Sequence, residues 1–210
     1  MSKRKKGPDS SHGSLTRRSF LRGVGIAAGG TSVLSSGLLT HAIDTATPIS
    51  VGPGPTPITL NINGTSRRIS VEPRVTLADV LREQLGMTGT KVICDRGTCS
   101  GCTVWLDGMP VNSCMIFAMD VGDRKITTIE GLGSPDRLHA LQAAFVDHDG
   151  MQCGYCTPGM VMSCAALLAR DPNPTTQDVQ QAISGNICRC GTYPKVIEAT
   201  LAAAKLRKEA

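Results

Sequence analysis

The sequence predicts an α+β fold in which a strand-rich part precedes a helical part. Up to about residue 129, apolar and polar residues alternate in short segments, and Asn63-Gly64 and Asp107-Gly108 supply dipeptides that favour two-residue hairpin turns. After that, apolar residues recur every three or four positions, which is typical of amphipathic helices. The change of period at Gly131–Pro135 predicts the boundary between two small domains.

Two hairpins and one further strand are expected in the first part. Each hairpin has alternating apolar residues on both sides of its turn dipeptide, as a strand with one buried face requires. The expected strand segments are residues 58–62, 69–71, 103–106, 109–111 and 126–129.

A helix is expected between the two hairpins. Thr76 can cap its first turn together with Asp79 three residues later, and Gly86 can end it. The apolar stripe of this helix consists of Leu77, Val80, Leu81 and Leu85.

Four helical segments are expected in the second part. The first two segments show apolar stripes. The last segment begins with Pro194, a residue suited to the first turn of a helix. They are marked by Leu138, Leu141, Ala144 and Phe145, by Met160, Cys164, Leu167 and Leu168, by Thr176–Ser184, and by Pro194–Leu206.

The first 46 residues resemble a twin-arginine export signal. Thr16–Leu21 reads T-R-R-S-F-L and follows the basic run Lys3–Lys6. The next segment, Gly23–Leu39, is too short and too rich in glycine for a stable membrane span. Cleavage after Ala42 or after Ala46 would suit the pattern, and the alternative is a disordered tail with an accidental arginine pair. The signal predicts a periplasmic protein that folds before export.

Residues 47–57 form a Pro/Gly-rich linker, so the predicted domains are residues 58–133 and 134–210. The formal charge of +5 does not belong to them. The sequence has 22 Lys/Arg and 17 Asp/Glu. Seven of the basic residues and two of the acidic residues lie in Met1–Ala46, so the rest of the chain has fifteen of each and no net charge. A nucleic-acid-binding protein would carry its basic excess on a folded face, so that class is excluded.

Eight of the nine cysteines fall into two groups of four. The first group has the C-x4-C-x2-C spacing of plant-type [2Fe-2S] ferredoxins with a fourth cysteine after a short gap. Gly97 and Gly101 let its loop turn backbone amides toward cluster sulfurs. The group consists of Cys94, Cys99, Cys102 and Cys114.

The second group pairs a C-x2-C with a C-x-C motif, each beside an expected helix end. A structural zinc site is an alternative for this group, since zinc also binds four thiolates, although C-x-C is less typical of it. Disulfides are the other alternative in an oxidising compartment, although folded export allows metal loading first. The group consists of Cys153, Cys156, Cys188 and Cys190.

The ninth cysteine and the two histidines outside the leader are expected to have structural roles. Cys164 falls on an apolar helix face and is expected to be a buried hydrophobic residue rather than a ligand. His139 and His148 lie near the two ends of one expected helix, where surface or capping roles fit best. No nucleophile, phosphate-binding or dinucleotide motif is found, so no catalytic residue is predicted.

The cysteines lie in three characteristic segments, Cys94–Cys102, Gln152–Gly159 (Q-C-G-Y-C-T-P-G) and Gly185–Cys190 (G-N-I-C-R-C), and Ile126–Gly133 adds a fourth. Together they resemble the small subunit of the xanthine oxidase family of molybdenum hydroxylases. With the leader, the resemblance is closest to the iron-sulfur subunit of periplasmic aldehyde oxidoreductases. It covers about Ile58 to Leu206, nearly the whole mature chain.

This resemblance implies a plant-ferredoxin-like β-grasp domain with one [2Fe-2S] cluster, followed by a four-helix domain with another. It also implies a molybdopterin-binding large subunit that hydroxylates the substrate with oxygen from water and releases two electrons. These would pass through the helical-domain cluster and the ferredoxin-like cluster to a FAD-binding subunit or an external acceptor. Gln152 and the neighbourhood of Cys190 would contact the pterin. Gly191-Thr192-Tyr193 departs from the Thr-Gly-Tyr of many relatives.

Two competing functions stay open at this point. A free two-cluster ferredoxin would shuttle electrons without a fixed enzyme partner, whereas the expected pterin contact at Gln152 favours a subunit. A zinc- or disulfide-stabilised binding protein would have no redox role. The substrate, the pterin form and the terminal acceptor lie in partner chains.

Overall fold

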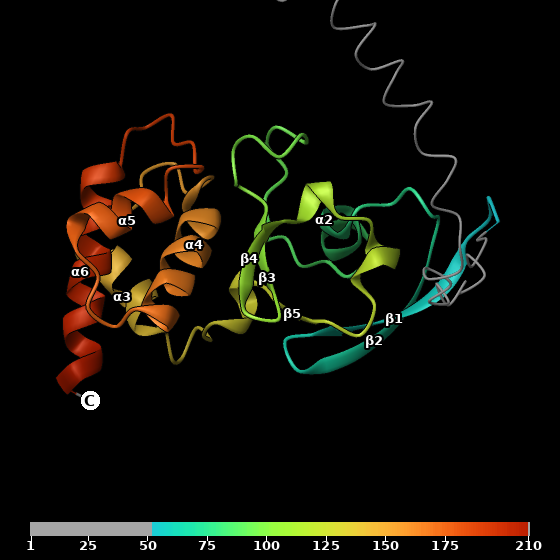
Figure 1. Ribbon diagram of the computed structural model, residues 1–210, viewed down its shortest axis with the longest axis horizontal. Coiled ribbons are helices and arrows are strands. Elements are labelled where there is room, and N and C mark those ends of the chain that lie inside the picture. The colour runs from blue at the N-terminus through green and yellow to red at the C-terminus, as the bar shows by residue number, and fades with distance from the viewer. Residues whose placement is uncertain (1–51, 210) are drawn as a thin grey trace, which may run out of the picture. The chain divides into compact units, whose positions relative to one another are not determined.

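Two hairpins supply most of the strands in the first half of the chain, shown in Figure 1. The computed structural model describes residues 52–209, so the predicted signal peptide and residues 47–51 of the predicted linker lie outside the described residues. Strand β1 (Thr56–Ile62) pairs with β2 (Thr65–Val71), and β3 (Thr103–Leu106) pairs with β4 (Met109–Asn112), both antiparallel. Asn63 and Gly64 turn the first hairpin with φ of 50° and 77°, and Asp107 and Gly108 turn the second with 50° and 82°. These left-handed turns match the prediction from the two dipeptides.

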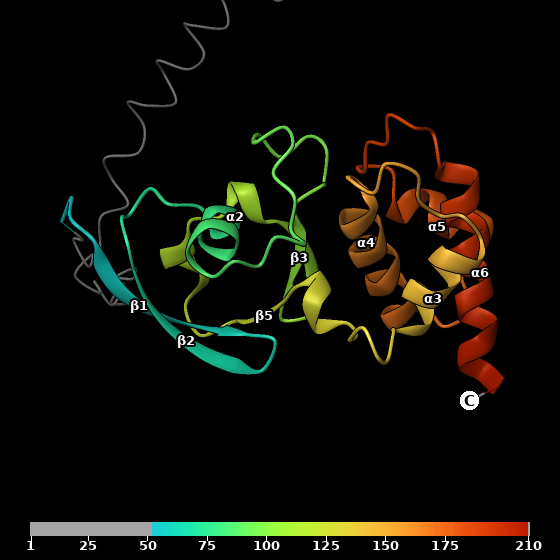
Figure 2. The same cartoon turned by 180° about the vertical axis from the view of Figure 1, so that it is seen from behind.

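A short fifth strand joins the hairpins into one mixed sheet. β5 (Lys125–Thr127) lies parallel to β1 and antiparallel to β3, which gives the order β2-β1-β5-β3-β4. Figure 2 shows the long β1–β2 ribbon at the edge of this sheet. The predicted strand over residues 126–129 is therefore shorter, because Ile129 begins a 3-10 turn, η5 (Ile129–Gly131).

The helix between the hairpins covers the sheet. It consists of α2 (Leu77–Asp79) and a wider π-helical turn, η2 (Val80–Gln84). Thr76 and Asp79 form the predicted capping box. The amide of Asp79 donates to the Thr76 hydroxyl at 3.2 Å, and the amide of Thr76 donates to the Asp79 carboxylate at 3.3 Å. The apolar side of the helix packs on the sheet. This core includes Leu60, Ile62, Val71, Leu77, Val80, Leu81, Val104, Leu106 and Ile126.

The second half of the chain is helical (Figure 1). Its helices are α3 (Ala140–Asp147), α4 (Thr157–Arg170), α5 (Thr176–Ala182) and α6 (Tyr193–Glu209). Phe145, Met160, Cys164 and Leu168 are at most 1% exposed in their shared core. Burying a side chain such as Phe145 contributes roughly 1.5–3 kcal/mol, so this core holds the four helices together.

The structure corrects some element details. Leu138 lies before α3 and is 48% exposed, because His139 has extended backbone angles and caps the helix. The sequence pattern also did not predict η3 (Ser113–Met115) and η4 (Ala118–Val121), two 3-10 turns. The α+β fold and its order of elements are confirmed.

Residues 52–209 belong to one compact unit, so the predicted domain boundary after Gly133 stays a prediction. The two halves are joined by direct hydrogen bonds. The indole N–H of Trp105 in β3 donates to the carbonyl oxygen of Met162 in α4 at 2.9 Å. Among the described helices, none combines the length and the apolar character that crossing a membrane requires.

Candidate iron-sulfur centres

The first cysteine group lies on one loop and one turn of the strand-rich half. Cys94, Cys99 and Cys102 lie on the loop before β3, and Cys114 lies in η3 directly after β4. The β3–β4 hairpin thus returns the chain to the loop that precedes it. Cys102 and Cys114 are buried against Ala78 of α2.

Gly97 gives the loop its tight curvature. It has a φ of +72°, and a Cβ there would lie 2.8 Å from Cγ of Met115. Its carbonyl oxygen also accepts a 2.9 Å hydrogen bond from the Asn112 side chain. A larger residue would be strained and would push the loop away from the turn that carries Cys114.

The four sulfurs of this group are arranged as two pairs. Cys94 is within hydrogen-bonding reach of Cys99, and Cys102 is within reach of Cys114. Hydrogen bonds from Thr98 and from the backbone of Arg96 lower the pKa of Cys94 to about 6. Burial and the neighbouring Cys102 raise the pKa of Cys114 to about 11.

The second group is brought together by helix packing. Cys153 and Cys156 precede α4, with Cys156 as its N-cap residue, and Cys188 and Cys190 lie between α5 and α6. Cys156 pairs with Cys188, while Cys153 pairs with Cys190. The first of these pairs faces inward, and both members of the second are exposed.

This paired arrangement fits two-iron clusters better than single zinc ions. Zinc requires its four ligands around one point, at about 2.3 Å for each thiolate. A [2Fe-2S] cluster instead takes two thiolates on each iron, as the two pairs of each group offer. All nine cysteines are free thiols in the structure.

The ninth cysteine and the two histidines behave as predicted. Cys164 is fully buried in α4, and this burial raises its pKa to about 11. His139 caps α3, with Nδ1 accepting from the amide of Leu141 at 3.2 Å, and His148 is the C-cap residue. Cys164 thus lies in the helical core, and the two histidines lie at the two ends of α3.

The backbones of the two cysteine groups touch. The amide of Ile187 donates to the carbonyl oxygen of Cys99 at 3.1 Å, and the Asn186 side chain donates to the carbonyl oxygen of Ser100 at 3.1 Å. Gly159 in α4 allows this approach, since a Cβ there would lie 2.2 Å from the Ser100 oxygen. The sequence motifs contained these residues, but their spacing gave no sign of this contact.

Tyr193 holds the loop that makes the contact. Its hydroxyl accepts from the amide of Cys188 at 2.8 Å and donates to the carbonyl oxygen of Asn186 at 3.0 Å. One side chain of α6 thus fixes the backbone on both sides of Ile187. The spacing of the motifs around Tyr193 does not predict this role.

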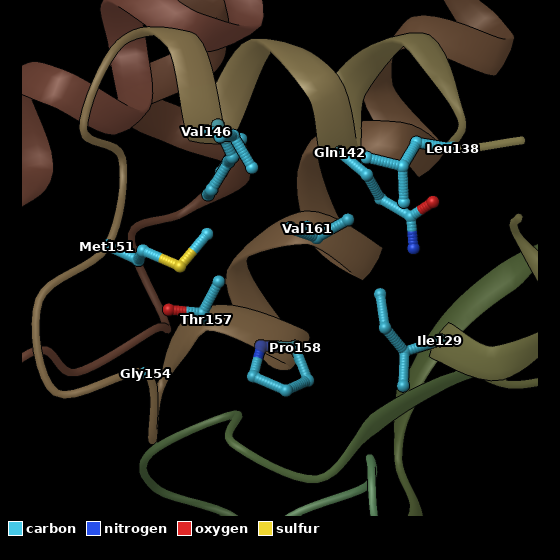
Figure 3. A pocket seen from close by; sticks show the side chains of 10 residues that line it. Ile129, Leu138, Gln142, Val146, Met151, Gly154, Thr157, Pro158 and Val161 are labelled. Carbon is cyan, nitrogen blue, oxygen red and sulfur yellow. The ribbon is translucent and has the colours of Figure 1, made fainter. Parts of the chain in front are cut away.

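An apolar hollow lies beside the Cys153 loop, shown in Figure 3. Its volume is about 280 Å³. The side chains of Leu138, Val146 and Met151 surround it with those of Ile129 and Val161, and Gln142 and Thr157 are the polar side chains of its lining. Neither Gln142 nor Thr157 is an acid or a base, so the lining does not suggest proton-transfer chemistry.

Gln152 is exposed directly before the exposed Cys153. Its side-chain amide has both a donor and an acceptor, which suits recognition of a pterin ring edge. The expected pterin contact of Gln152 and Cys190 stays a prediction.

Comparison with known protein families agrees with the arrangement of the cysteines. Residues 60–127 match the 2Fe-2S iron-sulfur cluster binding domain family, and residues 128–201 match the [2Fe-2S] binding domain family. Each matched range contains one cysteine group in full. The two families therefore assign one cluster to each half of the chain.

Individual relatives extend this similarity to most of the chain. The aldehyde oxidoreductase iron-sulfur-binding subunit PaoA of Escherichia coli K12 is 41% identical over 201 residues, which cover 89% of this chain and 86% of that protein. A chain of quinoline 2-oxidoreductase from Pseudomonas putida superposes with a TM-score of 0.71 at 41% identity, covering 75% of this chain and 98% of that chain. For the aldehyde oxidoreductase of Desulfovibrio desulfuricans the TM-score is 0.71 at 43% identity, covering 73% of this chain and 17% of that chain.

The fold, the two matched domains and these relatives lead to one assignment. The chain carries two [2Fe-2S] clusters and is the electron-transfer component of an oxidoreductase. It belongs to the family of small iron-sulfur subunits of molybdenum hydroxylases.

Proposed function

We propose that this chain passes electrons from a molybdopterin-binding partner subunit to a flavin subunit or an external acceptor, and that the helical half receives them first. Each cluster, when bound, stores one electron between its ferric and ferrous states. The proposed ligands are Cys153, Cys156, Cys188 and Cys190 in the helical half, and Cys94, Cys99, Cys102 and Cys114 in the strand-rich half.

A gradient of exposure within the helical group supports this direction. Cys153 and Cys190 are exposed, as is the neighbouring Gln152, so this pair is available to a partner. Cys188 is buried and Cys156 is half-buried, on the side of the group that faces the interior. We therefore assign the exposed pair to the molybdopterin side and the inner pair to the route onward.

The observation that carries the proposal is the hydrogen bond from Ile187 to Cys99. Ile187 directly precedes Cys188, and Cys99 belongs to the other group, so a single 3.1 Å hydrogen bond joins the backbone of one ligand to that of the residue next to another. The nearby bond from Asn186 to Ser100 fixes the same two loops. Electrons would cross between the groups here, where covalent and hydrogen-bonded atoms form a continuous route.

The exit side of the strand-rich group is proposed at Cys94. This cysteine is partly exposed, whereas Cys99, Cys102 and Cys114 are buried. Its loop neighbours Asp95 and Arg96 are exposed. A flavin subunit or a soluble acceptor would approach this part of the loop.

We assign the partner enzyme to the aldehyde-oxidising type and the chain to the periplasm. The alignment with the Escherichia coli subunit covers 89% of the chain, more than residues 58–210 alone can supply, so it extends into the leader. That relative is named for aldehyde oxidation. The T-R-R-S-F-L segment of the leader supports export by the twin-arginine route after cluster insertion.

Two serine variants test the electron order in the complex with its partner subunits. Cys190→Ser should slow the first reduction of iron-sulfur signal by an aldehyde substrate, followed by freeze-quench EPR. Cys99→Ser should leave that first reduction unchanged and should stop turnover with an external acceptor. Equal slowing of the first reduction by both variants would contradict the order, and no reduction by aldehydes in the wild-type complex would contradict the substrate class.

A further inference from the structure

The sulfur of Cys188 receives hydrogen bonds from one side chain and from the backbone of the loop that follows it. The hydroxyl oxygen of Thr192 lies 3.2 Å from this sulfur. The backbone amides of Gly191 and Thr192 also donate to it. Gly191 has a φ of +77°, a conformation that glycine adopts without strain and that turns these amides toward the sulfur.

Cys156 and Cys190 have fewer donors around their sulfurs. Cys190 receives a backbone hydrogen bond from Cys153. Cys156 has the neighbouring Cys188 thiol as its side-chain contact, and burial raises its pKa to about 12. Burial also raises the pKa of Cys188, but the hydrogen bonds, with the Thr192 hydroxyl foremost, outweigh it and bring the pKa to about 7.

Ligation to iron decides the direction of the hydrogen bond. A thiolate ligand has no proton, so the Thr192 hydroxyl must be the donor and the Cys188 sulfur the acceptor. Thr192 is 4% exposed and Cys188 is 8% exposed, so water competes little for this contact. In such a site a hydrogen bond to charged sulfur is stronger than it would be in water.

We propose that Thr192 sets the reduction potential of the helical-half cluster by donating a hydrogen bond from its hydroxyl to the Cys188 sulfur. The inference rests on the proposed function, because it takes Cys188 as a cluster ligand. When one electron arrives from the partner subunit, negative charge on the ligand sulfurs increases, and the hydroxyl stabilises this reduced state more than the oxidised state. Thr192 therefore raises the potential and favours electron uptake from the molybdopterin side.

Position and rigidity support a role for this particular hydroxyl. Cys188 belongs to the inner pair and follows Ile187, whose amide contacts Cys99. Tyr193 holds the same loop through the amide of Cys188 and the carbonyl oxygen of Asn186. Thr192 thus acts at the sulfur that lies on the proposed route between the two groups.

Potentiometric EPR titration of the complete complex tests the inference. Thr192→Val keeps the shape of the side chain and removes the donor, so the midpoint potential of one [2Fe-2S] signal should become more negative. The other signal should stay unchanged and serves as the internal reference. Thr192→Ser keeps a hydroxyl and should restore the wild-type potential.

Thr200→Val is the matched control. Thr200 is likewise a buried threonine and lies within α6, but its hydroxyl donates to the carbonyl oxygen of Val196 at 2.7 Å and contacts the non-ligand Cys164. Its replacement should move neither potential. In addition, proton ENDOR of the reduced cluster should show an exchangeable coupling that Thr192→Val abolishes and Thr200→Val retains.

The outcomes separate this inference from the proposed function. Unchanged potentials in Thr192→Val, with both signals present and full iron content, would overturn the role of Thr192 and leave the two-cluster assignment intact. If Thr192→Val loses its cluster, the smaller Thr192→Ala provides the same comparison. Cluster loss in both variants would also overturn the inference, because it would make Thr192 a requirement for assembly. Absence of a second [2Fe-2S] signal in the wild-type complex would instead contradict the proposed function.

Discussion

The amide of Ile187 and the carbonyl oxygen of Cys99 are joined by a 3.1 Å hydrogen bond. This bond connects the loop between α5 and α6 to the cysteine loop that precedes β3. It runs from backbone to backbone, whereas the neighbouring contact at Ser100 uses the side chain of Asn186. The relation gives a physical basis for electron transfer between the two halves.

Ile187→Pro should slow electron transfer between the clusters several-fold. Proline has no amide hydrogen, so the bond to Cys99 is lost, whereas Ile187→Ala keeps the amide and should transfer electrons at the wild-type rate. Pulse radiolysis with detection of both EPR signals measures the rate. Equal rates in the two variants, at equal iron content, would show that the bond is not on the route.

Gly159→Ala should destabilise the protein by about 1–2 kcal/mol. The added Cβ would lie 2.2 Å from the Ser100 carbonyl oxygen, and overpacking of this kind costs about 1–3 kcal/mol. The helix preference of alanine offsets up to about 1 kcal/mol of that cost. Denaturant unfolding of the cluster-loaded protein measures the change.

Gly54→Ala is the control for this prediction. No atom lies within 4 Å of a Cβ at Gly54, so this variant should unfold at the wild-type denaturant concentration. A Gly159→Ala variant as stable as Gly54→Ala would mean that α4 and the Cys99 loop are not in close contact in solution.

Thr98→Val should shift the other cluster, in the strand-rich half. The Thr98 side chain donates to the Cys94 sulfur and is the largest cause of its lowered pKa of about 6. Removing this donor should make the potential of that cluster more negative without moving the helical-half signal. Thr98 is exposed, so we expect a smaller shift than Thr192→Val produces. A shift larger than that of Thr192→Val in redox titration would contradict the expectation that a buried donor has the stronger effect.

Cys164→Ala should retain both clusters. Cys164 is fully buried among the helices, and Thr200, its polar neighbour, keeps its hydrogen bond to Val196. The lost sulfur should cost about 1 kcal/mol of stability, as removal of one buried group usually does. Iron analysis and EPR should give wild-type values, whereas Cys156→Ala should lose the helical-half signal. Loss of iron in Cys164→Ala would contradict the ligand set.

Local sequence patterns predicted most of the fold. The Asn63-Gly64 and Asp107-Gly108 turns, the Thr76 capping box and the buried stripe of α4 depend on neighbouring residues, and the structure contains all of them. The grouping of the cysteines was also predictable, because the motif spacings are specific. The exposure of Leu138 was not predicted. Its place in the apolar stripe suggested burial, but His139 has an extended backbone, so the helix begins only at Ala140 and Leu138 lies outside it.

Contacts between distant segments could not be predicted in this way. Spacing identified Cys99 and Cys188 but gave no sign that Ile187 would donate to the Cys99 carbonyl oxygen. Likewise, Gly191-Thr192-Tyr193 was visible only as a departure from the family pattern. Its effect, a hydroxyl directed at the Cys188 sulfur, depends on the turn at Gly191 and on the burial of Thr192.

The most direct test of the account is EPR spin quantitation of the dithionite-reduced protein, combined with iron, sulfide and zinc analysis. The pairing of sulfurs in each cysteine group predicts two distinct [2Fe-2S] signals of about one spin each per chain, with iron and sulfide in equal amounts and no zinc. A single signal, or zinc in place of iron in either group, would contradict the assignment of two clusters.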